Sequence, residues 1–339
     1  MAWAHLARRY AGETAVIGFD LMNEPFPGSR IRDAMWNVWR ALPDILRGVD
    51  AEAGDADYPN APLPGRFMAA LDRYDNYRHF VAAFESTQRR FEQGPLAAMY
   101  RRVAGAIRAA GSTQTILLES GPFSNFGAQS FIEPLTDAQG NRDPQQAYIP
   151  HGYDIVVDTP YACRPNPDRV GHIFDNLAKT GRRLAMPMIV GEWGALYGSP
   201  KCLPAARMYV VALETHLAGD TYWDYHRNIE NAAYFEALRR PCAERVAGRL
   251  LEYRYDFDAS AFACAWEEGA DIAAPTRIYV HEDCFSDAHA VTLEPGGTGF
   301  TYEPVGAGLT AGHLLIPPTG AGGPRRLSIA PKRPPASIP

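Results

Sequence analysis

The segment AVIGFDLMNEP (15–25) decides the fold class of this chain. Its apolar run over 15–22 includes β-branched residues and predicts a short buried strand. Pro25 cannot extend a strand ladder, so the strand must end before it. The polar residues Asn23 and Glu24 are therefore expected at the C-terminal end of this strand.

Four further apolar runs follow the same plan and end in polar or aromatic residues. They are TQTILLES (113–120), AYIPHGYDIVV (147–157), MPMIVGEWG (186–194) and DTYWDY (220–225), with strand ends at Glu119, Tyr153, Glu192 and Trp223. The last three ends recur at intervals of about 30–40 residues, the length of one strand and one returning helix. Helical patterns over 169–183 and 202–219 fill two of these intervals. The pattern predicts an α/β fold with a buried parallel sheet.

In an α/β barrel the C-terminal strand ends form the active-site face. Only five strands are visible here, whereas a closed barrel of this class has eight, so the sequence predicts a partial barrel. The long interval after the first strand holds an insertion over about 27–110, including a helical pattern from Asp75 to Ala110 that is broken near Gly94-Pro95.

The pattern changes towards the C-terminus. A last helix is expected over 230–248, and short β-rich runs separated by Gly/Pro turns follow from about Arg249. Such spacing is typical of a small β-sandwich. The predicted domains are a catalytic domain over 1–248, a β-sandwich over 249–331 and a tail over 332–339.

Composition excludes several classes of protein. The 339 residues carry 33 Lys and Arg against 39 Asp and Glu, a net charge of −6, which argues against a protein that mainly binds nucleic acid or an anionic membrane. No apolar run reaches the roughly 18 residues of a membrane helix. The five cysteines form no CxxC pair, so a zinc site is not expected; Cys163–Cys202 and Cys264–Cys284 disulfides and free thiols all remain open.

The first residues read as a helix that starts without a capping residue, because Trp3, Leu6, Ala7 and Tyr10 fall on one helical face. This start leads us to expect that sequence preceding it is missing. No signal-peptide apolar region is present, and no localisation is assigned.

Glu24 and Glu192 carry the predicted chemistry. Each ends a predicted strand, and the ends of parallel strands converge on one face. A carboxylate pair there suits glycoside hydrolysis, in which one group protonates the leaving oxygen and the other attacks the anomeric carbon or activates water. This chemistry requires no metal and no cofactor.

These motifs resemble glycoside hydrolase family 5, a family of retaining (β/α)8-barrel enzymes. GFDLMNEP is similar to its strand-4 motif and IVGEWG to its strand-7 motif, while HGY (151–153) and Trp223 match strands 6 and 8. The resemblance is closest to the endoglycoceramidase-like branch. It implies Glu24 as acid/base and Glu192 as nucleophile.

The resemblance also implies the substrate-binding residues. Asn23 would donate to the sugar 2-OH, Tyr153 would orient Glu192, His151 would lie near Glu24, and Trp223 would stack under the sugar. Glu119 is expected either to touch substrate or to be structural, and Trp193 either to line the site or to pack.

The resemblance covers strands 4–8 only, so the chain is expected to be N-terminally truncated and to self-associate through its open barrel edges. The expected substrate is a glycolipid, an oligosaccharide joined to ceramide, and the insertion would supply an apolar wall from Phe67, Met68, Leu71, Tyr74, Tyr77 and Phe80. The alternatives are a β-glucosidase of steryl or other lipid glucosides, a β-glucanase, and a non-catalytic glycan- or glycolipid-binding remnant.

Overall fold

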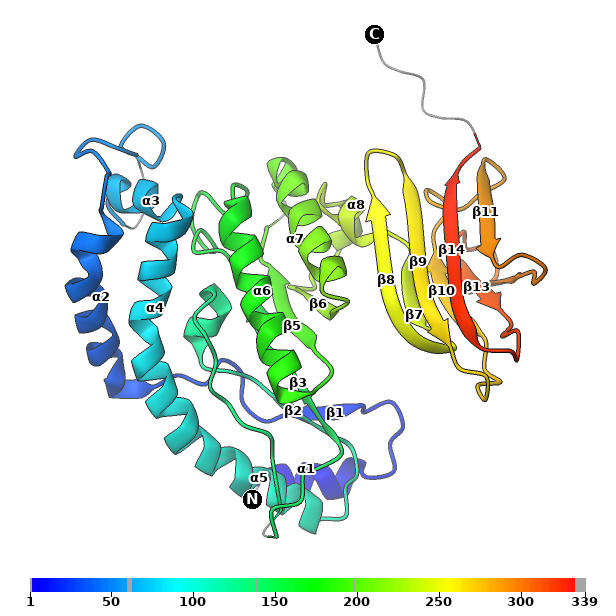
Figure 1. Ribbon diagram of the computed structural model, residues 1–339, viewed down its shortest axis with the longest axis horizontal. Helices are drawn as coiled ribbons and strands as arrows, with labels where there is room; N and C mark the ends of the chain where they lie inside the picture. The colour runs from blue at the N-terminus through cyan, green and yellow to red at the C-terminus, as the bar shows by residue number, and fades with distance from the viewer. Residues whose placement is uncertain (1, 60–62, 138, 198, 333–339) are drawn as a thin grey trace. The chain divides into compact units, whose positions relative to one another are not determined.

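The computed structural model describes residues 2–59, 63–137, 139–197 and 199–332. The chain forms two compact units, one made of Met1–Tyr197 with Ala218–Tyr225 and the other of Gly198–Leu217 with His226–Pro339 (Figure 1). The second unit therefore includes residues 198–217 and 226–248, which the predicted catalytic domain over 1–248 contained.

The first unit is built on short parallel strands that follow one another in chain order. They form two sheets of orders β1-β2-β3 and β4-β5-β6, and a parallel bridge joins Tyr148 at the end of β3 to Met188 just before β5. Their bounds are β1 Gly18–Asp20, β2 Thr115–Leu118, β3 Gln146–Tyr148, β4 His151–Gly152, β5 Ile189–Gly194 and β6 Gly219–Trp223. Each predicted strand is present, and the third is divided into β3 and β4 at Ile149-Pro150. The α/β class is confirmed.

The described helices of this unit are α1 Ala2–Tyr10, α2 Ile31–Ile45, α3 Gly65–Leu71, α4 Tyr74–Phe91, α5 Ala97–Ala109 and α6 Pro167–Leu184, with short turns η1 Gly28–Arg30, η2 Glu92–Leu96 and η3 Pro122–Phe126. Helices α2 and α3 lie beside α4 at one edge, and α1 lies beside α5 (Figure 1). The predicted interruption near Gly94-Pro95 is the widened helical turn η2, which joins α4 to α5. Pro95 removes one backbone donor, and the wider turn accommodates it.

Two large apolar clusters lie in the core of the described part of this unit, beside a small one of Met68, Val156 and Tyr161. One joins α1 and α5 to the first strands and includes Phe19, Ile116 and Tyr148. The other packs α2, α3 and α4 together and includes Val38, Leu71 and Phe84. Helices α2, α3 and α4 of the insertion thus share one apolar cluster, whereas α5 packs with the strands.

A buried ion-pair network fixes the loop after β4. The Arg169 guanidinium, near the start of α6, donates to both carboxylate oxygens of Asp154 at 2.8 and 2.9 Å and to Asp72 at 2.6 Å. Asn166 caps α6 by accepting the N–H groups of Asp168 and Arg169. Since Asp154 adjoins Tyr153, this network holds a predicted site residue in place.

The second unit contains two four-stranded antiparallel sheets of orders β12-β13-β10-β7 and β11-β14-β9-β8. Their bounds are β7 Cys242–Arg245, β8 Gly248–Asp256, β9 Ala261–Glu268, β10 Thr276–Val280, β11 His289–Glu294, β12 Thr301–Pro304, β13 Gly312–Ile316 and β14 Gly323–Pro331. Trp266, Phe262 and Leu314 are buried in one cluster with residues of both sheets. The predicted C-terminal β-sheet domain is confirmed, and residues 333–339 of the predicted tail lie outside the described residues.

The helix predicted over 230–248 is wrong. The described residues 226–241 form the short turn η5 Ile229–Asn231 and the four-residue helix α8 Phe235–Leu238 before β7 begins. The elements η4 Pro200–Cys202 and α7 Leu203–Thr215 come earlier in this unit. Pro241 ends the helical pattern because it lacks a backbone N–H, and the residue before a proline disfavours the helical conformation.

Three further observations bear on the sequence-based expectations. Cys163 and Cys202 are disulfide-bonded, whereas Cys242, Cys264 and Cys284 carry free thiols, so a Cys264–Cys284 bond is absent.

Among the described residues, no helix is long and apolar enough to cross a membrane. Within that same part of the chain β1 pairs only with β2 and β6 only with β5, and self-association through these edges stays a prediction.

Candidate active site

Glu24 lies in the turn after β1, in a backbone conformation that is unusual for a residue with a side chain. Its φ is +43°, in the left-handed region. Its backbone N–H donates to Oε2 of Glu119 at 2.9 Å, which ties this turn to the end of β2. The Glu24 side chain remains 39% exposed and so is open to a ligand.

His151 links the three predicted glutamates. Its Nδ1 lies 2.9 Å from Oε1 of Glu24 and 3.3 Å from Oε2 of Glu192. Its Nε2 lies 3.4 Å from Oε1 of Glu119. His151 and Glu192 are direct partners in the β4–β5 register, which explains why they meet. Strand ends far apart in sequence therefore converge on one buried imidazole.

The carboxylates of Glu24 and Glu192 are close to each other. Their nearest ligand atoms and the His151 nitrogen all lie within 4.8 Å of one another. The cluster of Glu24, His151 and Glu192 could also hold a cation, but both carboxylates already accept hydrogen bonds from neutral side chains. Asn125 Nδ2 donates to Glu24 at 2.9 Å, and the Tyr153 hydroxyl donates to Glu192 at 3.0 Å. The arrangement resembles two carboxylates held for reaction with an organic substrate.

Glu119 is 1% exposed, so it is far more buried than Glu24 or Glu192. Burial and the neighbouring Asp20 carboxylate raise the pKa of Glu119 to about 10, so its side chain is protonated at neutral pH. A neutral Glu119 avoids a buried negative charge beside the half-buried Asp20. This position favours support of Glu24 and His151 over direct contact with a substrate.

Glu192 is less exposed than Glu24, at 18%. Burial raises the pKa of Glu192, while His151 and the Tyr153 hydroxyl act in the opposite direction. The same surroundings raise the pKa of Tyr153, which remains a neutral donor. Burial thus makes the Glu192 carboxylate less well hydrated, and the two donors keep it oriented.

The two predicted tryptophans have different environments. Trp193 is fully buried, donates from Nε1 to Asp220 at 2.9 Å and packs edge-on against Tyr222. Its role is therefore packing. Trp223, at the end of β6, is 47% exposed and presents a ring for stacking. Asn23 is exposed beside Glu24.

Sequence reasoning missed two residues of this site. Asn125 lies in η3 after β2, where only its position after a strand end marks it. Asp20 is the last residue of β1, and no sequence signal distinguishes its contact with Glu119 from that of an ordinary strand-end residue.

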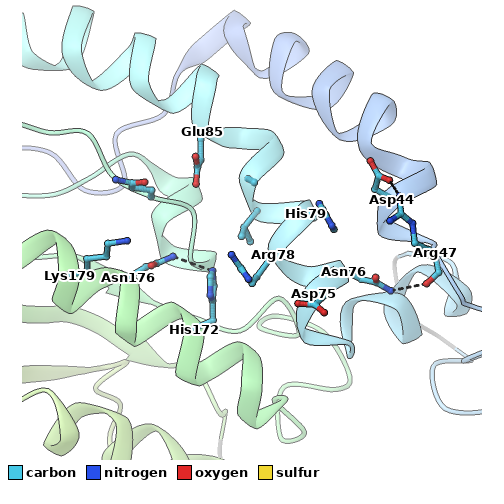
Figure 2. A pocket seen from close by; sticks show the side chains of 13 residues that line it. Asp44, Arg47, Asp75, Asn76, Arg78, His79, Glu85, His172, Asn176 and Lys179 are labelled. Carbon is cyan, nitrogen blue, oxygen red and sulfur yellow. Dashed lines mark hydrogen bonds and ion pairs between the residues drawn. The ribbon is translucent and has the colours of Figure 1, made fainter.

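A separate polar cleft of about 600 Å³ lies between α4 and α6, and none of the site residues above lines it (Figure 2). Basic side chains such as Arg78 and Lys179 face acidic ones such as Glu85 there. Burial lowers the pKa of His172, which lies within hydrogen-bond distance of Asn176. The mixed charges offset one another, and the lining shows no arrangement of reacting groups.

Comparison with known families supports an assignment. A family model described as Cellulase (glycosyl hydrolase family 5) matches residues 65–229. A second, described as the glycoside hydrolase family 5 C-terminal domain, matches residues 240–311. Together they cover more than half of the chain. No curated protein matches it.

Solved structures with a similar fold are known. Endo-glycoceramidase II from Rhodococcus sp. in a ganglioside GM3 complex is 22% identical, with a TM-score of 0.65 over 98% of this chain and 62% of that chain. An endogalactoceramidase is 18% identical, with a TM-score of 0.55 over 97% of this chain and 60% of that one. Cryptococcus neoformans sterylglucosidase 1 is 10% identical, with a TM-score of 0.52 over 77% of this chain and 50% of that one. The chain thus spans less than two thirds of the length of these proteins.

Proposed function

Because the chain belongs to glycoside hydrolase family 5, we propose that it is a retaining glycosidase that cleaves the β-glycosidic bond between a sugar and a lipid through Glu24 and Glu192. The observation that carries the proposal is the convergence of both carboxylates on His151 Nδ1, at 2.9 and 3.3 Å. Retaining glycosidases hold their two carboxyl groups about 5–5.5 Å apart, whereas inverting enzymes leave about 6.5–9.5 Å for a water molecule. The spacing within 4.8 Å of the nearest oxygens supports the retaining class.

The proposed reaction has two steps. Glu192 attacks the anomeric carbon while Glu24 donates a proton to the departing glycosidic oxygen, so the bond to the lipid breaks and a glycosyl ester forms on Glu192. Glu24 then removes a proton from a water molecule, which attacks the same carbon and releases Glu192. Two inversions leave the anomeric configuration unchanged.

Neighbouring side chains orient the two catalytic carboxylates. The hydroxyl of Tyr153 and the imidazole of His151 hold Glu192, while Asn125 and His151 hold Glu24. We assign Asn23 to the sugar 2-OH and the exposed ring of Trp223 to the floor under the sugar. Both assignments rest on the family motifs and on the exposure of these side chains.

An apolar aglycone is supported by the surface beside Glu24. Met22 and Phe26 flank the catalytic turn and are 47% and 52% exposed. Within the insertion, Phe67 and Phe80 line a separate apolar groove of about 470 Å³, whose lining includes none of the site residues. Met68, Leu71 and Tyr77 are instead buried, and Tyr74 is 43% exposed. The lipid-linked glycosides named for the similar structures are consistent with this choice.

A fluorinated substrate analogue tests the catalytic proposal. A 2-deoxy-2-fluoro β-glucoside with a good leaving group slows both steps but the second one more, so the glycosyl-enzyme should accumulate. Peptide mass spectrometry should locate the sugar on Glu192, and the Glu192→Gln variant, as control, should stay unlabelled. A label on another residue, or none on the unmodified protein, would refute the proposal.

Substrate choice separates the remaining candidates. Lactosylceramide should release intact lactose. Cleavage of steryl glucoside alone would indicate a lipid β-glucosidase, and cleavage of cello-oligosaccharides alone a β-glucanase. Saturable binding of lactosylceramide without turnover of any of these substrates would indicate a non-catalytic binding protein.

A further inference from the structure

Helix α2 has two apolar faces, of which only one is covered. Ala34, Val38 and Ile45 are buried in the apolar cluster that α2 shares with α3 and α4. On another face Trp36 and Trp39 are 57% and 62% exposed. Their rings stack at a centroid distance of 4.9 Å and an interplanar angle of 16°. Figure 1 shows α2 beside α4 at the edge of the first unit.

The exposed tryptophans adjoin a groove without polar character. Met35 is 50% exposed and also lines the groove of about 470 Å³ between α2, α3 and α4. Arg66 is the one charged residue among the described residues that line the groove, and its guanidinium donates to the carbonyl oxygen of Val49. The groove and the tryptophan pair thus form one apolar surface, which we call the α2 face.

The charge on this face is positive although the whole chain carries −6. Arg32 and Arg40 lie at helical spacing from Trp36, so they flank it on the same side of α2. Neither has an ion pair among the described residues, whereas the nearby acids Asp33 and Asp44 are paired with Arg90 and Arg47. The α2 face therefore offers two uncompensated guanidinium groups around its aromatic centre.

This combination fits one kind of partner. Tryptophan prefers the interface between lipid headgroups and acyl chains, and arginine beside it pairs with lipid phosphate. A glycan platform would instead surround the rings with acids and amides that are free to bind hydroxyl groups. The acid and the amide beside Trp36 already have partners, because Asp33 pairs with Arg90 and Asn37 donates to Ser86. The remaining neighbours are the two arginines, Met35 and the apolar groove. We infer that the α2 face docks this protein onto the surface of an anionic phospholipid bilayer. The inference concerns binding and does not require turnover.

Vesicle binding tests the inference directly. The protein should co-sediment with phosphatidylcholine vesicles that contain phosphatidylserine, and brominated lipids should quench its tryptophan fluorescence. Trp36→Ala with Trp39→Ala should weaken binding at least about tenfold, because both rings leave the lipid interface. Leu309→Ala, which removes a 58% exposed side chain of the second unit, is the control and should leave binding unchanged.

Charge reversal provides a second, independent variant. Arg32→Glu with Arg40→Glu should weaken binding to the anionic vesicles by about tenfold or more, and much less to pure phosphatidylcholine. The exposed pair Arg101 and Arg102 on α5, reversed in the same way, should have little effect. All variants should keep the melting temperature of the unmodified protein, because none of the substituted side chains is buried.

Three results would overturn the inference. The first is absence of vesicle binding by the unmodified protein, or binding that neither double variant weakens. The second is a change in the fluorescence of Trp36 and Trp39 on addition of lactose but not of lipid vesicles. This result would show that the α2 face binds a glycan. The third is an unmodified protein that is dimeric in analytical ultracentrifugation and double variants that are monomeric but bind vesicles unchanged. This result would assign the α2 face to contact with a second copy of the chain.

Discussion

The carboxyl group of Glu119 accepts the backbone N–H of Glu24 at 2.9 Å, at the point where Glu24 adopts a φ of +43°. A buried residue on one strand end thereby fixes the backbone of the proposed acid/base on another. The contact needs an acceptor oxygen but no negative charge, and the raised pKa of Glu119 agrees with a neutral group.

Substitution of Glu119 tests this relationship. Glu119→Gln keeps an acceptor oxygen and should retain activity within about threefold. Glu119→Ala leaves the Glu24 N–H unpaired and should cost about 1–3 kcal/mol of stability and at least about tenfold in kcat. Thermal denaturation and turnover of an aryl glycoside measure both quantities. Equal damage by Gln and Ala would mean that the ionised carboxylate is required.

The pH dependence of stability follows from the same group. The folded pKa of Glu119 is about 10 against an ordinary 4.5, so the folded state holds this proton more tightly than the unfolded state. The free energy of unfolding should therefore fall as pH rises from about 4.5 towards 10, by up to about 1.4 kcal/mol per unit. Chemical denaturation across this range should give a flatter profile for Glu119→Gln. An unchanged slope would show that Glu119 is already ionised.

Arg169 should be important for the stability of the first unit. Its guanidinium is fully buried between Asp154 and Asp72, so its removal leaves the Asp154 carboxylate without its main partner. Arg169→Ala should cost about 3–5 kcal/mol in urea unfolding. The exposed Arg182 at the other end of α6 is the control, and its replacement by Ala should cost little. A mild effect of Arg169→Ala would show that water replaces the guanidinium.

The proposed acid/base has a distinct kinetic signature. In Glu24→Ala the first step should survive on aryl glycosides with good leaving groups, which need little protonation, and the glycosyl-enzyme should accumulate. Substrates with poor leaving groups should lose at least about 10²-fold. Azide should give a product of retained configuration, because it attacks the covalent intermediate. Equal losses on both kinds of substrate would exclude this role.

The sequence predicts those features that local signals specify. Pro25 predicts that the first strand has ended, and Gly194 is the last residue of β5. The apolar run before each places Glu24 in the turn after β1 and Glu192 near the end of β5. The contacts of Asn125 and Asp20 were not predictable in this way, because they depend on how η3 and β1 are placed in three dimensions. A strand-end pattern does not distinguish a buried carboxyl from an exposed one, so the role of Glu119 stayed open until its burial was known.

The second unit gives a similar lesson. The apolar spacing of residues 230–240 is helical, yet Pro241 and the pairing of β7 with β10 override it. Helical periodicity shows which residues would share one face of a helix. It does not show that the following residues pair with a distant strand, as β7 does with β10. The sheets themselves were predictable because their strands alternate and are bounded by Gly and Pro turns.

The central claim is that Glu192 is the nucleophile, and the stereochemistry of azide rescue tests it most directly. Glu192→Gly should abolish turnover, and azide should occupy the vacated space and restore cleavage of an activated aryl β-glycoside. Proton NMR of the glycosyl azide should show the inverted, α-configured product. A β-configured azide from Glu192→Gly, or an α-configured azide from Glu24→Ala, would contradict the assignment of the two carboxylates.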